Sequence, residues 1–152
     1  MIIVAMTTDH IREIMRYEQD MFGPESWSAS AYREELADRI QRYYVVALDD
    51  DAVLLGWAGV RVLSDEAEIL TIGVIPNARR AGTGSALLGE LVEECRRRGV
   101  RVVFLDVRVA NEDAQRLYVR EGFVVVGRRR GYYDNGRSDS LTMSLALESV
   151  PQ

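Results

Sequence analysis

Residues 72–88 read IGVIPNARRAGTGSALL and mark the point where an apolar strand turns into a helix. Pro76 blocks further strand pairing, and the apolar residues that follow Gly82 recur at helical spacing. Gly82 and Gly84 let the backbone turn tightly and approach a ligand closely. The stretch therefore predicts a strand, a short loop and a helix, the first part of a strand–helix–strand crossover over residues 66–109.

The loop between this strand and this helix has the features of an anion site. The first N–H groups of a helix lack intrahelical partners, and the helix dipole adds positive potential at the same end. Arg79 and Arg80 add two full positive charges just before the helix. A pyrophosphate would fit there, and an ordinary turn with solvated arginines is the open alternative. The loop is neither a P-loop nor a dinucleotide-binding fingerprint, because the lysine of the first and the third glycine of the second are missing.

Outward from this loop, the apolar pattern alternates between the periods of strands and helices. Asp9, Ser28 and Asn111 are the predicted N-caps of three helices. Strands are predicted over residues 2–6, 42–48, 53–62, 66–75, 101–109, 123–130 and 139–147, and helices over about 10–21, 28–36, 82–98 and 111–120. The expected fold class is α/β (α+β), a mostly antiparallel sheet flanked by helices, in a single domain over residues 1–152.

Composition excludes several classes of chemistry. One cysteine (Cys95) and one histidine (His10) exclude an internal disulfide and a Cys/His zinc cluster, and a reducing cytoplasm is expected. All 19 basic residues are arginine, which excludes a lysine nucleophile. No apolar run approaches the ~18–20 residues of a membrane span, and Asp9 interrupts the start, so neither a membrane partner nor a signal peptide is expected. The net charge of −5 disfavours nucleic acid and favours a cationic partner.

Several stretches resemble the GNAT acetyltransferases. The R-x-x-G-x-G sequence of residues 79–84, after a strand that ends in V-x-P, resembles the acyl-CoA pyrophosphate loop of that family. Within the family, the chain is similar to the RimI-type ribosomal-protein alanine N-acetyltransferases. The similarity is carried by WSASAYREEL (27–36), AEILTIGVIP (67–76), FLDVRVANEDAQRLYVREGF (104–123) and RRRGYYDNGRSDSLTMSLAL (128–147).

This resemblance implies the GNAT fold, with a central parallel pair of strands that splay apart, and a cytoplasmic enzyme. The implied reaction is acetylation of the N-terminal alanine of a small-subunit ribosomal protein by direct attack of its amine on acetyl-CoA. The alternatives are a GNAT enzyme with another acceptor (a small amine, an antibiotic or many protein N-termini) and a non-catalytic acyl-CoA-binding scaffold. The oligomeric state is not predicted.

The resemblance assigns acetyl-CoA as co-substrate, with no metal. Backbone groups of Ile72, Gly73 and Val74 would hydrogen-bond the pantetheine arm, as an added strand would. Asn111 would bond the same arm while it caps its helix. The pyrophosphate would lie against Arg79, Arg80, Ala81, Gly82, Thr83, Gly84 and Ser85.

Two side chains are implied as the catalytic groups. Tyr118 would be the general acid, since a phenol of pKa ~10 can protonate the departing thiolate; a core aromatic is the alternative. Asp106 would be the general base that takes a proton from the acceptor's ammonium, of pKa ~8; a salt bridge to Arg108 is the alternative. Type members of the family carry glutamate at this place, so the shorter aspartate favours a relay through water. Glu68 is the substitute base.

The acceptor peptide is expected between two walls. The hairpin tip and residues 22–27 would form one wall, and Tyr132 and Tyr133 the other. Trp27 and Tyr133 would hold the peptide N-terminus, and Glu68 would also contact it. Tyr32 would either join them or pack in the core. Residues 128–130, three arginines in a row, would be either a solvated strand face or a contact to CoA phosphate.

Overall fold

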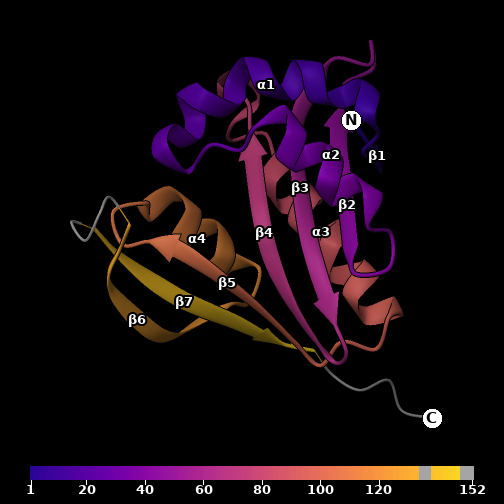
Figure 1. Ribbon diagram of the computed structural model, residues 1–152. Helices are drawn as coiled ribbons and strands as arrows, with labels where there is room; N and C mark the ends of the chain where they lie inside the picture. Colours follow the sequence, from indigo (N-terminus) through magenta and orange to yellow (C-terminus); the bar gives the residue numbers. More distant parts are fainter. Residues whose placement is uncertain (134–137, 148–152) are drawn as a thin grey trace. The chain divides into compact units, whose positions relative to one another are not determined.

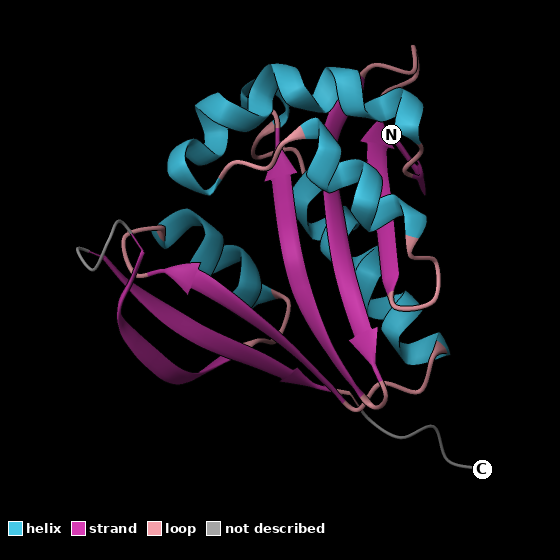
Figure 2. Ribbon diagram, viewed as in Figure 1, coloured by secondary structure: helices cyan, strands magenta, loops and turns pink. Residues whose placement is uncertain are grey.

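The computed structural model describes residues 1–133 and 138–147 and places every predicted strand and helix (Figures 1 and 2). The strands form a seven-stranded sheet in the order β1-β2-β3-β4-β5-β7-β6. In chain order the elements are β1 (Ile2–Ala5), α1 (Thr8–Phe22), η1 (Gly23–Glu25), α2 (Ala29–Ala37), β2 (Arg42–Leu48), β3 (Leu54–Leu63), β4 (Glu66–Val74), η2 (Pro76–Ala78), α3 (Thr83–Arg97), β5 (Val102–Arg108), α4 (Glu112–Arg120), β6 (Val124–Tyr133) and β7 (Ser138–Ala146).

The sheet is mixed, as predicted. β4 pairs parallel with β5, with residues 66–68 opposite residues 102–104, and this is the crossover that the loop before α3 predicts. The registers of β1 with β2, β2 with β3, β5 with β7 and β6 with β7 are antiparallel. Across the described residues, no helix is both long enough and apolar enough to cross a membrane.

The chain divides into two compact units. Unit 1 consists of Met1–Arg61 and Leu70–Leu91, and unit 2 of Val62–Ile69 and Val92–Gln152. β3, β4 and α3 each contribute residues to both units. The prediction of a single domain over residues 1–152 stays a prediction.

In unit 1, helices cover both faces of the sheet. Tyr43 and Tyr44 are neighbours on β2, so their side chains point to opposite faces. The Tyr44 hydroxyl donates to Glu35 of α2 (2.6 Å), and the Tyr43 hydroxyl donates to Glu90 of α3 (2.9 Å). Helices α2 and α3 therefore lie on opposite faces of the strands.

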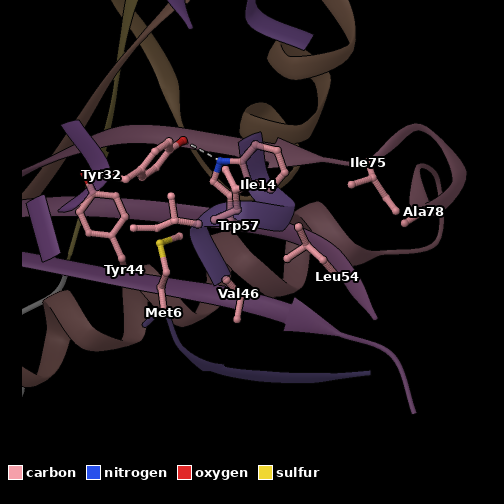
Figure 3. Close-up of a cluster of buried hydrophobic side chains, with 10 residues drawn as sticks. Met6, Ile14, Tyr32, Tyr44, Val46, Leu54, Trp57, Ile75 and Ala78 are labelled. Carbon is pink, nitrogen blue, oxygen red and sulfur yellow. Dashed lines mark hydrogen bonds between the residues drawn. The ribbon is translucent and has the colours of Figure 1, made fainter. Parts of the chain in front are cut away.

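The core of unit 1 lies on the face that α1 and α2 cover (Figure 3). Trp57 of β3 and Tyr32 of α2 are completely buried at its centre. Tyr44 packs directly over Gly59, its partner across β2 and β3, where an added Cβ would lie 2.1 Å from the ring. The buried cluster is Met6, Ile11, Ile14, Tyr32, Tyr44, Val46, Leu54, Trp57, Ile75 and Ala78.

In unit 2, α4 covers one face of β5, β7 and β6. Buried residues alternate along β5, and Leu105 on the apolar face is 2% exposed. An added Cβ at Gly122, just after α4, would lie 3.2 Å from Leu145, whose partner on β5 is Val103. Helix α4 therefore lies over the face of β5 that Val103 and Leu105 share.

The predicted cap of the first helix was wrong. Helix α1 begins at Thr8 with Thr7 as its N-cap, and the Thr7 N–H donates to Nδ1 of His10 (2.9 Å). The side chain at the third helical position thus reaches back to the cap, while Asp9 lies in the first turn, where the dipole favours its charge. Ser28 and Asn111 cap α2 and α4 as predicted, and Cys95 is buried in α3.

Candidate active site

The loop between β4 and α3, in unit 1, is held by hydrogen bonds to backbone carbonyls of the same segment. After Pro76 the chain makes a short 3-10 turn, in which the Ala78 N–H donates to the Ile75 carbonyl (2.9 Å). The Arg79 guanidinium donates back to the Val74 carbonyl (3.2 Å), and the Thr83 hydroxyl donates to the Ala78 carbonyl (3.4 Å). These bonds set the direction in which α3 leaves the sheet.

The same loop presents donors and positive charge to solvent. Arg80 (φ 64°) and Gly82 (φ 83°) both have left-handed backbone, the conformation found in anion-binding turns of the chain. Residues 79–82 are exposed, and a Cβ added to Gly82 would meet nothing within 4 Å. The first N–H groups of α3 lack intrahelical acceptors, and its dipole adds positive potential. The donor set therefore fits a pyrophosphate.

The strand segment that leads into this loop contains the predicted pantetheine residues. Ile72 and Val74 are half-buried, and Gly73 between them is buried. A Cβ at Gly73 would lie 3.1 Å from both Met21 and Trp57, so glycine is what allows the end of α1 to pack on β4. Ile72 and Val74, neighbours of Gly73 on the strand, point to the other face of β4.

Asp106 and Glu68 lie on one face of the sheet in unit 2. Glu68 is the parallel partner of Phe104, and Asp106 follows two residues later, so all three side chains share a face. The Thr142 hydroxyl, opposite Asp106 on β7, donates to its carboxylate (2.7 Å). The partner of Asp106 is thus a neutral hydroxyl on the next strand. Thr142 was not predicted, because its place opposite Asp106 depends on the pairing of β5 with β7.

Tyr118 and Asn111 lie on the other side of that sheet, with α4. Tyr118 is 6% exposed, and its ring centroid is 6.0 Å from that of Phe123. The Asn111 side chain accepts from the Ala114 N–H (3.1 Å), which confirms its capping role. Gln115 donates to the carbonyls of Arg108 and Val109 and so ties α4 to the end of β5.

The predicted acceptor residues fall into three environments. Trp27 is half-buried in unit 1, with its ring 5.2 Å from that of Tyr32. Tyr32 is 0% exposed, so packing in the core is its role. Tyr133, which the sequence predicts as the start of a turn over residues 133–137, is instead the last residue of β6, and its side chain lies outside the described residues. The rest of that predicted turn, residues 134–137, also lies outside them.

The three arginines of β6 are exposed, in accordance with a solvated strand face. Arg128 pairs with Asp139 of β7 (2.6 Å), and the Arg129 guanidinium lies 5.1 Å from the centre of the Tyr132 ring. A backbone N–H from Gly131, together with Arg128, lowers the pKa of Asp139. The carboxylate of Asp139 thus ties β6 to β7 in this region.

Glu18 of α1 is a polar residue that the sequence did not single out. It is 1% exposed and forms a hydrogen bond with the buried Tyr32. Burial raises the pKa of its carboxyl, although hydrogen bonds from Tyr32 and from the Trp27 backbone oppose this. The available signal was its position, since Glu18 follows Ile11 and Ile14 on the apolar stripe of the helix.

Comparison with known proteins gives three results. Residues 11–123 match the model of the acetyltransferase (GNAT) family. The chain is 34% identical over 123 residues to [ribosomal protein bS18]-alanine N-acetyltransferase of Escherichia coli (strain K12), covering 80% of this chain and 81% of the relative. It is 36% identical over 146 residues to N-alpha-acetyltransferase RimI of Mycobacterium tuberculosis, covering 93% and 89%.

Solved structures share the fold. The crystal structure of the ribosomal-protein-S18-alanine N-acetyltransferase from Escherichia coli has a TM-score of 0.86 and 28% identity, over 99% of this chain and 96% of that one. Arabidopsis thaliana NAA60 in complex with acetyl-CoA has a TM-score of 0.84 and 21% identity, over 96% and 98%. The matched family model and the two curated relatives show that the chain belongs to the acetyltransferase (GNAT) family.

Proposed function

We propose that this acetyltransferase moves the acetyl group of acetyl-CoA to the N-terminal alanine of ribosomal protein bS18, in the cytoplasm. The observation that carries the proposal is the 34% identity, over four-fifths of both chains, to the Escherichia coli enzyme named for that reaction. The basic tails of ribosomal proteins agree with the net charge of −5 of this chain.

The coenzyme would be held mainly by backbone groups of unit 1. Residues 72–74 would pair with the pantetheine arm as an added strand does. The left-handed residues Arg80 and Gly82 and the first turn of α3 would bind the pyrophosphate, with charge from Arg79. Asn111, whose side-chain oxygen already caps α4, would bond the pantetheine through its remaining amide capacity. Bound acetyl-CoA supplies the activated acyl group.

Proton transfer would be the task of two side chains of unit 2. Asp106 would accept the proton of the acceptor's ammonium, directly or through water, while Thr142 holds its carboxylate in one orientation. Tyr118 would donate a proton to the departing sulfur from the side of the sheet that α4 covers. The Asp106 carboxylate would therefore act on the attacking amine and the Tyr118 phenol on the departing sulfur, each from its own face of the sheet.

The test is acetylation of synthetic peptides with labelled acetyl-CoA. We expect a peptide that begins with alanine and carries the bS18 N-terminal sequence to be acetylated on its α-amine. A matched peptide with a blocked N-terminus should not react, because the attacking nitrogen is then an amide. Equal rates on alanine and on unrelated first residues would indicate a broad N-terminal acetyltransferase. Turnover of small amines only would contradict the proposal.

A further inference from the structure

A buried carboxylate on α1 has no part in the reaction as described. Glu18 is 1% exposed, on a helix whose other buried residues are the apolar Ile11 and Ile14. Isolated carboxylates are costly to bury, so such a group needs compensating hydrogen bonds. Its partners therefore indicate what it does.

The hydrogen bonds of these partners form a network in which each donor points toward Glu18. The indole N–H of Trp57 can only donate, and it donates to the Tyr32 oxygen (3.0 Å; Figure 3). Thr71 also hydrogen-bonds the Tyr32 hydroxyl. The one proton of the Tyr32 hydroxyl is then committed to Glu18, to which it donates. Glu18 is the terminal acceptor of the network.

The second bond of Glu18 is to the segment that leads into α2. The backbone N–H of Trp27 donates to the Glu18 carboxylate. Residues 23–27 are a short 3-10 turn and an extended link between α1 and α2, so they have little regular structure of their own. The ring of Trp27 packs against Tyr32. Glu18 and Tyr32 thus hold this segment both by its backbone and by its side chain.

At its other end the network reaches β4. Thr71 directly precedes Ile72, the first of the three residues that would pair with the coenzyme. The network therefore connects residues 23–27, which belong to the predicted acceptor wall, to the strand that would carry the acyl donor. All of its members belong to unit 1.

We propose that Glu18 is a positioning residue for the acceptor, which acts by fixing Trp27 and residues 23–27 through its bonds to Tyr32 and to the Trp27 backbone. This inference rests on the proposed function, since it concerns the acceptor of that reaction. Glu18 touches neither substrate. Its role is to determine where the acceptor wall lies.

The discriminating variant is Glu18→Gln. Glutamine keeps the size of the side chain but replaces one acceptor oxygen by an NH₂ group, which only donates. Both partners of Glu18 are donors, so the remaining oxygen can serve Tyr32 while the NH₂ group faces the Trp27 N–H. We expect the KM for an alanine-initiated peptide to rise at least about tenfold, with the KM for acetyl-CoA unchanged.

Two further variants complete the kinetic test. Tyr32→Phe removes the hydroxyl that joins the network, and the peptide KM should rise in the same direction. Glu13→Gln is the matched control, because Glu13 lies on the same helix but is exposed and pairs with Arg16. It should leave both KM values unchanged. An unchanged peptide KM in Glu18→Gln and Tyr32→Phe, or an equal rise in both KM values, would overturn the proposal.

A second measurement separates this inference from the proposed function. The chain has two tryptophans, and Trp57 is completely buried, so an aqueous quencher such as acrylamide reaches Trp27. Quenching should be stronger in Glu18→Gln than in the wild type and in Glu13→Gln. If the wild type acetylates no peptide, the proposed function fails, and quenching still tests the network. Equal quenching in all three proteins would contradict the positioning role.

Discussion

Asp106 and Thr142 make a pair whose two members can be tested separately. Asp106→Asn removes the group that would accept the ammonium proton, and we expect kcat to fall about 10²–10⁴-fold in steady-state assays with peptide. Thr142→Val removes only the hydroxyl that orients the carboxylate, and should lower kcat by less. Calorimetric titration with acetyl-CoA should give the same Kd for both variants and the wild type. Full activity of Asp106→Asn would transfer the role of base to Glu68, for which Glu68→Gln is the next test.

Tyr118→Phe isolates one hydroxyl group. The ring of Tyr118 is buried beside Phe123, and phenylalanine keeps that contact. We expect kcat to fall about 10²-fold or more while acetyl-CoA still binds, because only the proton donor is lost. Normal turnover would mean that Tyr118 is a core aromatic and that the thiolate is protonated by water.

At the scale of elements, two glycines predict opposite effects of the same substitution. Gly59→Ala would place a methyl group 2.1 Å from the Tyr44 ring, which is itself held by Glu35, so β2 or β3 must shift. We expect a loss of about 1–3 kcal/mol in the free energy of unfolding. Gly89→Ala, in the middle of α3, meets open space and should stabilise by about 0.5–1 kcal/mol. Urea unfolding measures both.

A small loss in Gly59→Ala would show that the Tyr44 side chain can leave the surface of β3 at little cost. Destabilisation by Gly89→Ala would mean that α3 has a neighbour at this position.

The elements themselves could largely be predicted from the sequence. The strand over residues 42–48, the caps Ser28 and Asn111 and the parallel crossover depend on local pattern and turn chemistry, and all were confirmed. The cap of α1 was missed because a histidine side chain reached back in place of the usual glutamate or glutamine.

Contacts across the fold could not be predicted in this way. The bond from Thr142 to Asp106 joins residues 36 positions apart, and the bond from Trp57 to Tyr32 joins residues 25 apart. Such pairs depend on how strands and helices are placed, which local periodicity does not determine. The roles of the coenzyme-binding, acceptor-binding and catalytic residues stay predictions.

For the whole molecule, the buried carboxyl of Glu18 predicts a pH dependence of stability. Burial raises the folded-state pKa of Glu18, opposed by the Tyr32 and Trp27 bonds, whereas the pKa of Asp139 is lowered. A carboxyl group whose pKa is higher in the folded state stabilises the protein at pH values below its unfolded-state pKa. This stabilisation is lost as the pH rises through its folded-state pKa. Asp139 has the opposite sign, with stability lost as pH falls.

Comparison of the wild type with Glu18→Gln isolates the contribution of Glu18 to the pH dependence, because Asp139 is the same in both proteins. We expect the unfolding free energy of the wild type, minus that of Glu18→Gln, to decrease as pH rises above the ordinary glutamate pKa of 4.5. Urea unfolding from pH 4 to pH 8 gives this difference. A difference that increases with pH would show that the hydrogen bonds of Glu18 outweigh its burial.

The left-handed backbone of Arg80 has a consequence for engineering this protein. A side chain in that conformation costs about 1–2 kcal/mol, which a glycine avoids, although glycine also gives the unfolded chain more freedom. Arg80→Gly would thus be nearly neutral or favourable for heat resistance, while it removes a charge from the proposed pyrophosphate loop. Selection of variants by thermal tolerance alone would accept this change, so a screen for robust catalysts should include retention on immobilised coenzyme.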